Sequence, residues 1–377
     1  MTHLRVAWLL TSAFYYWHPM LAKLSQIYPD TKAFVANWRG YAPGFEDSFQ
    51  IDIVGERKVV ALKKSSTSYG DNFTYLPLNI VNRLLAFRPH LIFSNSFGIW
   101  TILALLSRPI GRWRVVIAYE GSSPGVDYRS SPLRLTVRRA MVQAAHACIT
   151  NSQAGKAYLV DVLNADANQV FVHPYEVPAV QALTTRTEAQ QPLPDLKSPM
   201  FIAVGSISPS KGLQFLLEAC RALKEQGQES YSVLVVGEGD QRAELEQFCH
   251  THGITDRVYW VGRVEYGALG FYFEQADVFV LPTLEDTWGM VVLEAMVLGK
   301  PVLCSQYAGA SELITDGENG YQFDPYNPTE LAGLMTKLIS DPERVLEMGQ
   351  CSRRLMEQCS PEAAAGFLEQ VAMFVMQ

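Results

Sequence analysis

The stretch PTLEDTWGMVVLEAMVLGKP, residues 282–301, decides the fold class. It follows the short apolar run 278–281 and passes directly into a helical pattern, so that a strand end feeds a helix N-terminus. In α/β proteins phosphorylated ligands bind at such a place, because free N–H groups and the helix dipole both favour an anion. Two carboxylates, Asp286 and Glu294, flank the turn. They could bind hydroxyls, and phosphate together with hydroxyls indicates a nucleotide sugar.

The bulk composition bounds the class of protein. With 377 residues the chain is long for one core, and two domains are expected. A net charge of -7 gives no support for a nucleic-acid partner. The 6 cysteines are scattered without a C-x-x-C pair. This argues against a zinc site and a disulfide framework, and it fits a reduced, cytoplasmic compartment.

Neither a leader nor a membrane span is predicted. The apolar run in residues 1–11 is too short for a signal peptide and fits a first buried strand. No run reaches the roughly 20 apolar residues of a membrane helix, and residues 99–106 fit a core helix. Residues 133–142 carry three arginines beside an apolar face, which suits either an anionic membrane surface or a solvated helix face. We expect a cytoplasmic protein, with peripheral contact at the inner face of the membrane left open.

Short apolar runs alternate with amphipathic ones along most of the chain, which predicts mostly parallel sheets covered on both faces. The expected strands are residues 6–10, 33–36, 91–94, 115–118, 148–150, 170–173, 200–204, 232–236, 258–261, 278–281 and 302–304. The alternation stops at 178–199, a stretch of turn-forming residues. We therefore predict two doubly wound domains at 1–180 and 199–358, a linker at 181–198, and a final helix at 359–377. A site that uses both domains would lie in a cleft between them.

The segment 204–213, VGSISPSKGL, opens the second domain after its first strand. Gly205 permits a tight turn, and Ser210 is the expected N-cap of the next helix. Lys211 would then oppose the helix dipole, so a residue selected for stability alone would more often be acidic. A bound diphosphate would reverse that sign. The alternative is a solvated lysine at a helix start.

Two further strand ends carry candidate residues. Gly237-Glu238-Gly239 follows one strand, as either part of a ligand site or a tight strand-to-helix turn. Arg263 follows the next strand, where it could pair with phosphate, stack on a base, or lie in solvent. Glu294 lies in an otherwise apolar helix, where burial is costly without hydrogen bonds. A ribose diol would supply two donors, and a neighbouring backbone amide is the alternative.

The first domain offers fewer signals. His18 lies in the loop 12–18 after the first strand, and Tyr119 and Glu120 lie in a loop after a later strand. Both loops are expected to face the cleft, so these three residues are candidates for the acceptor side. His173, between a strand and Pro174, has a structural role as its simpler explanation.

Together, residues 205–212, 236–239, 261–264 and 286–296 resemble the retaining glycosyltransferases of family 4, which have the GT-B fold of two Rossmann-like domains facing a cleft. The resemblance implies that residues 1–180 bind the acceptor and residues 199–358 the donor. It also implies that the final helix packs back on the first domain. Lys211 and Asp286 are the implied catalytic residues. The implied donor-binding residues are Gly205, Ser206, Lys211, Gly237, Arg263, Asp286, Thr287, Trp288, Gly289, Met290, Val291 and Glu294.

The chain departs from the family pattern at several positions. Ser206 stands where the family usually has a phosphate-binding arginine, and Asp286 where it usually has a glutamate; Glu285 is the alternative for that role. Tyr119-Glu120 stands where many members have His-Asp. The first domain also lacks the family's glycine-rich loop. These departures leave open the identity of the donor and the acceptor.

The resemblance implies transfer of a hexose from a UDP- or GDP-sugar to the hydroxyl of a saccharide, lipid or metabolite, without a metal or another cofactor. The alternatives are a nucleotide-sugar epimerase or phosphorylase on the same scaffold, or a catalytically weak protein that binds sugar nucleotides.

Overall fold

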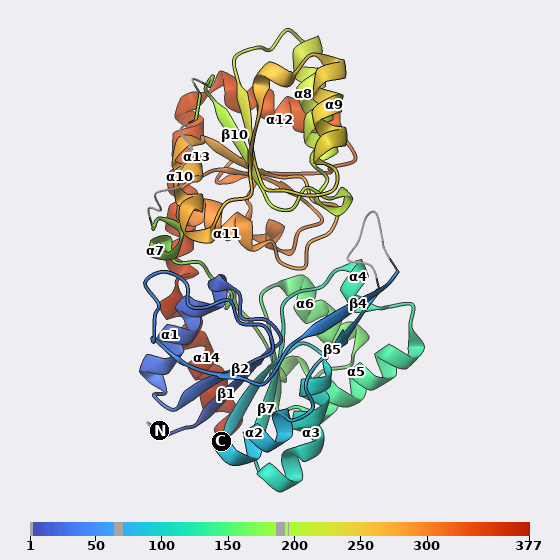
Figure 1. The fold of residues 1–377 in the computed structure, drawn as a ribbon, viewed down its shortest axis with the longest axis vertical. Helices are drawn as coiled ribbons and strands as arrows, with labels where there is room; N and C mark the ends of the chain where they lie inside the picture. The colour runs from blue at the N-terminus through green and yellow to red at the C-terminus, as the bar shows by residue number, and fades with distance from the viewer. Residues whose placement is uncertain (1–2, 64–70, 186–192, 195) are drawn as a thin grey trace. The chain divides into compact units, whose positions relative to one another are not determined.

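The computed structural model describes residues 3–63, 71–185, 193–194 and 196–377. They form two α/β units, which are described separately (Figure 1). The N-terminal unit contains residues 3–63, 71–178 and 359–377, and the C-terminal unit contains the described residues between 179 and 358. Part of the expected linker 181–198 lies outside the described residues.

A parallel sheet with the strand order β3-β2-β1-β6-β7-β8-β9 forms the centre of the N-terminal unit. Its strands, in chain order, are β1 Val6–Leu10, β2 Thr31–Val35, β3 Gln50–Ile53, β6 Leu91–Asn95, β7 Arg114–Tyr119, β8 Ala147–Thr150 and β9 Val170–Val172. A separate antiparallel pair consists of β4 Lys58–Lys63 and β5 Asp71–Tyr75. The inner strands are almost continuously apolar because helices cover both faces of the sheet.

The helices of the N-terminal unit include one from the far end of the chain. In chain order they are η1 Tyr15–Trp17, α1 His18–Ile27, α2 Ile80–Phe87, α3 Ile99–Gly111, α4 Pro124–Asp127, α5 Pro132–Ala144, α6 Gln153–Ala157, η2 Tyr158–Val162, η3 Ala167–Gln169 and α14 Pro361–Met376. The last of these, α14, packs against α1 (Figure 1). Lys23 Nζ lies 2.7 Å from Glu362 Oε1 across that contact.

The C-terminal unit contains a second parallel sheet, with the order β12-β11-β10-β13-β14-β15. Its strands are β10 Met200–Val204, β11 Ser232–Val236, β12 Val258–Gly262, β13 Val278–Leu281, β14 Val302–Ser305 and β15 Gly320–Phe323. Its helices are α7 Val180–Leu183, η4 Pro209–Lys211, α8 Leu213–Glu225, α9 Arg242–His252, η5 Thr255–Arg257, η6 Tyr266–Ala268, α10 Leu269–Gln275, α11 Met290–Val297, η7 Gly309–Leu313, α12 Pro328–Ser340 and α13 Pro342–Gln358.

Apolar periodicity explains how the helices of the C-terminal unit pack. In α8 the buried residues Leu213, Leu216, Leu217, Cys220 and Leu223 recur every three or four positions. They form one stripe, and that stripe belongs to the core of buried strand residues beneath it. Each domain thus buries the apolar sides of its helices on its own sheet.

The predicted fold class is confirmed: both units are α/β with parallel sheets. The expected strands 232–236 and 278–281 match β11 and β13 residue by residue. The prediction that Ser210 caps the next helix is wrong, because α8 begins at Leu213 and Gly212 occupies its N-cap position. Among the described residues, no helix is both long and apolar enough to cross a membrane.

Candidate functional site

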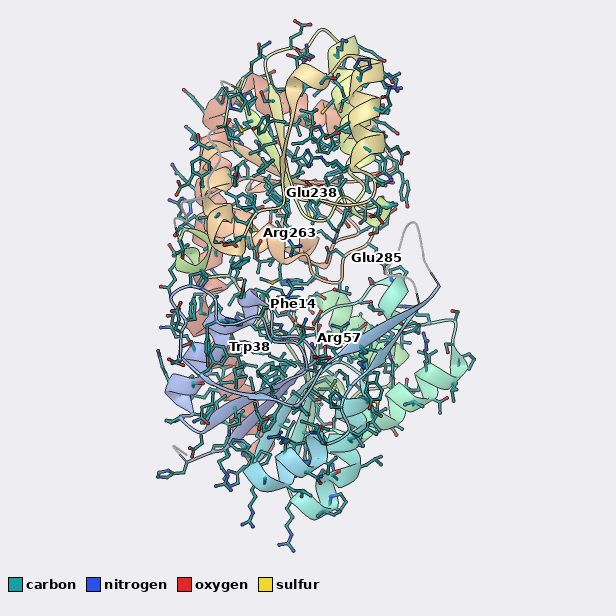
Figure 2. All side chains as sticks on the ribbon, in the orientation of Figure 1. Phe14, Trp38, Arg57, Glu238, Arg263 and Glu285 are labelled. Carbon is teal, nitrogen blue, oxygen red and sulfur yellow. The ribbon has the colours of Figure 1, made fainter. Side chains whose placement is uncertain are left out.

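The candidate site lies at the carboxyl end of the second sheet. There β10 lies between β11 and β13, so the strand order reverses at β10. In doubly wound sheets this reversal opens a crevice at the strand ends, and ligands bind there. The loops that follow β10, β11 and β13 carry most of the residues that the sequence singled out, and Figure 2 labels Glu238, Arg263 and Glu285 at this side of the unit.

Glycines bring the first two of these loops into contact. Gly205, after β10, donates its N–H to Val236 O at 3.0 Å. Gly237, after β11, has φ +150, and a Cβ there would lie 1.8 Å from Gly205 O. Only glycine fits that contact. The Gly-x-Gly sequence thus has a packing reason of its own, and the structural alternative for this motif is sufficient to explain it.

The loop after β10 also contacts the loop after β13. Ser210 O accepts hydrogen bonds from Leu284 N at 2.8 Å and from Thr283 Oγ1 at 3.1 Å. Gly212 has φ +66, and a Cβ there would lie 2.0 Å from Pro282 O. These contacts fix Lys211, which lies between Ser210 and Gly212, beside the segment that contains Asp286.

Lys211 and Asp286 form an ion pair at this junction. Lys211 Nζ lies 2.5 Å from Asp286 Oδ2, and their side chains keep 28% and 14% of their surface exposed. The backbone of Asp286 is fixed as well, since its N–H donates to Tyr307 O and its carbonyl accepts from Gly309 N. The site therefore holds an accessible ammonium group whose nearest anion is a carboxylate of the same site.

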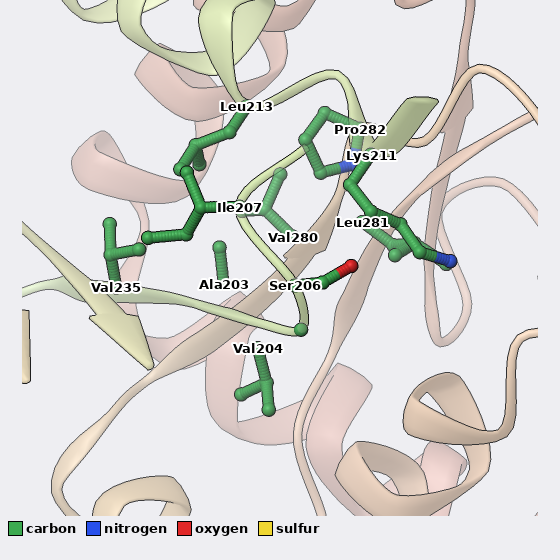
Figure 3. A pocket seen from close by; sticks show the side chains of 11 residues that line it. Ala203, Val204, Ser206, Ile207, Lys211, Leu213, Val235, Val280, Leu281 and Pro282 are labelled. Atoms are coloured by element: carbon green, nitrogen blue, oxygen red, sulfur yellow. The ribbon is translucent and has the colours of Figure 1, made fainter. Parts of the chain in front are cut away.

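A small cavity of about 30 Å³ lies beside this pair and is shown in Figure 3. Its wall is mostly aliphatic, and the Ser206 hydroxyl and the Lys211 ammonium are the polar side-chain groups among the residues that line it. A space of this size holds a water molecule rather than a nucleotide. Any nucleotide at this edge would have to lie on the open side of the strand ends.

Glu294 is buried on α11, as the sequence suggested. Burial raises the pKa of its carboxyl to about 7, and the facing Tyr266 hydroxyl offsets part of that rise. Burial and the nearby Glu294 in turn raise the pKa of Tyr266 well above its usual range. Near neutral pH the carboxyl group of Glu294 is thus balanced between its protonated and ionised forms.

The remaining donor-side candidates surround the start of α11. Gly289, with φ +91, precedes the helix, and the first N–H groups of a helix have no partner within it. Met290 and Val291 are the first two residues of α11, and Thr287 is half-buried. Trp288 is buried, and its carbonyl accepts a hydrogen bond from Ala310 N at 2.6 Å.

The two carboxylates considered for the catalytic position, Glu285 and Asp286, have different surroundings in the structure. Glu285 is only 4% exposed, whereas Asp286 forms the ion pair with Lys211. Arg263 is exposed just after β12, whose last residue, Gly262, accepts a hydrogen bond from Gly237 N at 2.8 Å. The loop with Arg263 therefore adjoins the loop with Gly237.

In the N-terminal unit, two of the three acceptor-side candidates are buried. His18 Nδ1 accepts from Ala42 N at 2.8 Å, and burial lowers the pKa of the imidazole to about 4. Tyr119 donates its hydroxyl to Asp127 Oδ1 at 2.6 Å. Glu120 is half-buried and accepts from Asn95 Nδ2 at 3.1 Å. The contacts of His18 and Tyr119 favour structural roles, and Glu120 is the more accessible of the three.

Within the described ranges, no three or more histidine, cysteine, aspartate or glutamate residues cluster so that they could hold a metal ion. The predicted absence of a metal requirement stays a prediction.

Comparison with known proteins identifies the C-terminal half of the chain. Residues 184–355 match the family model described as glycosyl transferases group 1. The matched range contains every donor-side residue named above. Several relatives of the chain are named as glycosyltransferases.

The D-inositol 3-phosphate glycosyltransferase of an Arthrobacter species is 30% identical over 218 residues, which cover 56% of this chain and 52% of the relative. The alpha-D-kanosaminyltransferase of Streptomyces kanamyceticus is 28% identical over 169 residues, covering 45% and 42%. The uncharacterized glycosyltransferase MJ1607 of Methanocaldococcus jannaschii is 32% identical over 142 residues, covering 38% and 36%. The matched part thus spans about a third to a half of the length of these relatives.

Solved structures share the fold over nearly the whole chain. Anabaena Alr3699/HepE in complex with UDP has a TM-score of 0.72 at 17% identity and covers 99% of this chain and 100% of its own. Sucrose-phosphate synthase from Thermosynechococcus elongatus has a TM-score of 0.71 at 19% identity, with 99% of each chain covered. At these identities the likeness establishes the GT-B fold.

Sequence reasoning missed Tyr266 as the group that faces Glu294. The two residues lie on different elements, η6 and α11, so no local spacing connects them. The available signal was a polar aromatic residue soon after Arg263, within a stretch already assigned to the strand ends.

Proposed function

We propose that this protein is a retaining glycosyltransferase that moves a hexose from a UDP- or GDP-sugar to a hydroxyl of an acceptor. The observation that supports this most is the accessible Lys211–Asp286 pair at the point of strand reversal. It lies in the part of the chain that matches the family model. An ammonium group beside a carboxylate suits a ligand with both a diphosphate and sugar hydroxyls.

In this proposal Lys211 binds the diphosphate and stabilises the negative charge that develops on it as it leaves. The first amide groups of α11, at Met290 and Val291, add to this stabilisation from fixed positions. Ser206 supplies a neutral hydroxyl where the family usually has an arginine, so Lys211 carries more of the charge. Gly205, where a Cβ would meet nothing within 4 Å, lets the phosphates approach the backbone, and Gly237 holds the neighbouring loop against it.

Asp286 faces the donor sugar, with Thr287, Trp288 and Gly289 beside it, and Glu294 holds the ribose diol. The raised pKa of Glu294 fits a carboxyl that lacks strong donors until a ligand supplies them. Arg263 is exposed at the neighbouring strand end, where it suits either the base or a phosphate.

The proposed reaction forms a bond between the sugar C1 and the acceptor oxygen while the bond between C1 and the phosphate oxygen breaks. The acceptor proton passes to the leaving phosphate oxygen on the same face of the sugar, so the configuration is retained. The protein then needs no nucleophile, and the proposal includes no metal or other cofactor.

Names of relatives and structures agree with this proposal. Several relatives are named as glycosyltransferases or glucosyltransferases, and structures of HepE contain UDP and UDP-glucose. None of these names favours an epimerase or a phosphorylase. We further propose that the N-terminal unit binds the acceptor, a saccharide, lipid or metabolite, and that the protein acts in the cytoplasm, with peripheral contact at the membrane through α5.

The test is an incubation with UDP-glucose, UDP-galactose and GDP-mannose, first alone and then with a panel of saccharide and lipid acceptors. NMR of the anomeric proton reports the stereochemistry of the product. We expect no change of the sugar without acceptor and a product of retained configuration with acceptor. Epimer formation without acceptor, or an inverted product, would contradict the proposal. Binding of a donor with no turnover across the panel would favour the catalytically weak binding protein.

A further inference from the structure

Three strand ends of the N-terminal sheet meet at one serine. Ser12 follows β1, Asn37 follows β2 and Arg57 follows β3. Ser12 Oγ accepts from Arg57 Nη1 at 2.9 Å and lies 3.5 Å from Asn37 Nδ2. The strand order reverses between β1 and β6, so this junction borders the crevice of the first sheet just as Lys211 borders that of the second.

The charge of Arg57 is not balanced by this junction. Its side chain is half-buried, yet it forms no ion pair with the residues that the structure describes, and its Nε is buried without a hydrogen-bond partner. Other buried or half-buried arginines of the same unit donate to carbonyl oxygens: Arg108 to Ala144 O, Arg138 to Asp127 O and Arg139 to Val162 O. Arg57 has only a hydroxyl, which is a weaker partner for a guanidinium.

Aromatic residues adjoin this junction along the chain, because Phe14 lies two residues after Ser12 and Trp38 directly follows Asn37. Phe14, 36% exposed, stacks on Tyr16 with ring centroids 5.7 Å apart, and the Arg39 guanidinium lies 5.5 Å from the Phe14 ring. Trp38 is half-buried and bridges to Ala13 through the backbone. Figure 2 labels Phe14, Trp38 and Arg57 in the upper part of this unit. Trp38 packs on His18 and Tyr41, whereas Phe14 keeps part of its ring exposed beside the junction.

A polar acceptor adjoins the same crevice from the other side. Asn95, the last residue of β6, donates Nδ2 to Glu120, while its Oδ1 is buried without a partner. At the end of β6, which pairs with β1, the amide oxygen of Asn95 could therefore accept a hydrogen bond from a ligand hydroxyl.

We propose that this edge, formed by Phe14, Trp38, Arg39 and Arg57, binds a sugar ring that carries a phosphate or a carboxylate. Arg57 would pair with the anion in the forked geometry that guanidinium groups favour. The C–H face of the ring would pack on the exposed part of Phe14, and Trp38, which stacks on His18, would border it. The inference rests on the proposed function, since it makes an anionic sugar the class of acceptor.

The test measures binding of glucose 6-phosphate, glucuronate, glucose and inorganic phosphate to the full chain, by calorimetry and saturation-transfer NMR. We expect at least one anionic sugar to bind about tenfold more tightly than glucose, which corresponds to one charge-assisted contact. Arg57→Gln should abolish this preference. The control Arg112→Gln, at an exposed arginine after α3, should keep it.

A second variant, at a partly exposed residue, distinguishes the contribution of the sugar-ring contact to binding from that of the anionic group. Phe14→Ala should weaken binding of the anionic sugar about fivefold and leave binding of inorganic phosphate unchanged. Equal binding of glucose and both anionic sugars, no binding of any of them, or an anion preference that survives in Arg57→Gln would overturn the inference. Equal binding of phosphate and anionic sugar would overturn its sugar-ring component.

Binding of UDP, measured in parallel, distinguishes this inference from the proposed function. Arg57→Gln should bind UDP like the wild type. If UDP binds and the anionic sugars show no preference, the inference fails and the proposed function stands. If an anionic sugar binds through Arg57 while neither UDP nor GDP binds, the site stands and the proposed function fails.

Discussion

At the scale of single residues, the ion pair between Lys211 and Asp286 is the feature from which the chemistry is argued. The two side chains meet at 2.5 Å although they come from loops far apart in sequence. A diphosphate that binds Lys211 must therefore compete with Asp286 for the same ammonium group. The carboxylate of Asp286 should therefore weaken binding of the nucleotide, while in the proposal it contacts the donor sugar.

Replacement of Asp286 by Asn should separate these two effects. We expect Asp286→Asn to bind UDP as tightly as the wild type or up to about tenfold more tightly, because a competing anion is removed. Turnover of the sugar donor should fall. Calorimetry with UDP and a transfer assay measure the two quantities. A tenfold loss of UDP affinity would show instead that Asp286 positions Lys211 for phosphate.

Glu294 should make the stability of the C-terminal unit depend on pH. Its pKa is raised from 4.5 to about 7 in the folded state, so the folded state holds a proton that the unfolded state releases. The stabilisation of the folded state by protonated Glu294 is complete below about pH 4.5 and is lost as the pH rises through about 7. Relative to Glu294→Gln, the wild type should lose roughly 2–3 kcal/mol of unfolding free energy between pH 5 and pH 8.

Urea unfolding of both proteins at the two pH values measures this difference. Glutamine can still accept from Tyr266 and does not titrate, so it is the matched reference. A constant difference in the free energy of unfolding across this range would mean that the carboxyl of Glu294 is ionised throughout.

Site residues could be singled out from the sequence where the chemical reason was local. The surroundings of a residue could not be predicted where they depend on distant segments. Lys211 was singled out because a cation in the first helical turn would oppose the helix dipole, but the structure places it before Gly212, the N-cap of α8, and its role as a site residue stays a prediction. The burial of His18 was not predictable, because the rings around it come from Trp38 and Phe49 as well as from its own segment. The run of aromatic residues before His18 was the signal for a buried histidine.

At the scale of elements, loops held together by glycine position the site. Gly237 is the tightest of these contacts, since a Cβ would lie 1.8 Å from a backbone oxygen of Gly205. The backbone on both sides belongs to strand ends, so neither side can yield easily. The alternative of a tight turn at Gly237-Glu238-Gly239 thus has a specific partner atom in the neighbouring loop.

Gly237→Ala should separate the loops after β10 and β11. We expect a loss of at least about 2 kcal/mol in the free energy of unfolding, from backbone strain and the steric conflict together. Affinity for UDP should fall as well. The control is Gly333→Ala on α12, where a Cβ meets nothing within 4 Å and alanine favours the helix. Equal stability of the two variants would contradict this account of the loops.

Element boundaries show where local rules were sufficient. The strand 278–281 was predictable because a fully buried strand has to be continuously apolar. The predicted start of α8 was wrong because serine is a preferred N-cap residue and Ser210 stands just before the helical pattern. Its carbonyl instead serves the loop after β13, and Gly212, in the left-handed region, precedes the helix. The start of the helix after Gly212 depends on the close contact of Gly212 with the carbonyl of Pro282, and no local sequence pattern predicts that contact.

At the scale of the whole molecule, the alternation of apolar and amphipathic segments was sufficient to predict two α/β units. The edge strand β3 was missed because it lacks a buried apolar run, since its residues are half-buried or exposed. Strand β15 and the β4–β5 pair were not predicted either. The chain returns at its end to the first unit, where α14 buries Leu368 and Val371 and contacts α1.

Leu368→Ala should therefore destabilise the first unit although it lies at the end of the chain. We expect a loss of about 2–5 kcal/mol, the usual cost of a cavity at a buried leucine. Hydrogen exchange should accelerate in β1 and α1 but not in β10 and β13. Met373→Ala, at a 38% exposed position of the same helix, is the control. Faster exchange confined to the second unit would contradict the placement of α14.

The most direct test of the central claim is a calorimetric titration of UDP and GDP into the full chain and into Lys211→Ala. Lys337→Ala, on α12 of the same unit, is the control. We predict that the wild type and the control bind one of the two nucleotides, and that loss of Lys211 weakens this binding about 10- to 100-fold, the value of a charged hydrogen bond to phosphate. Unchanged affinity in Lys211→Ala, or no binding of either nucleotide to the wild type, would contradict the claim that this edge of the sheet binds the donor.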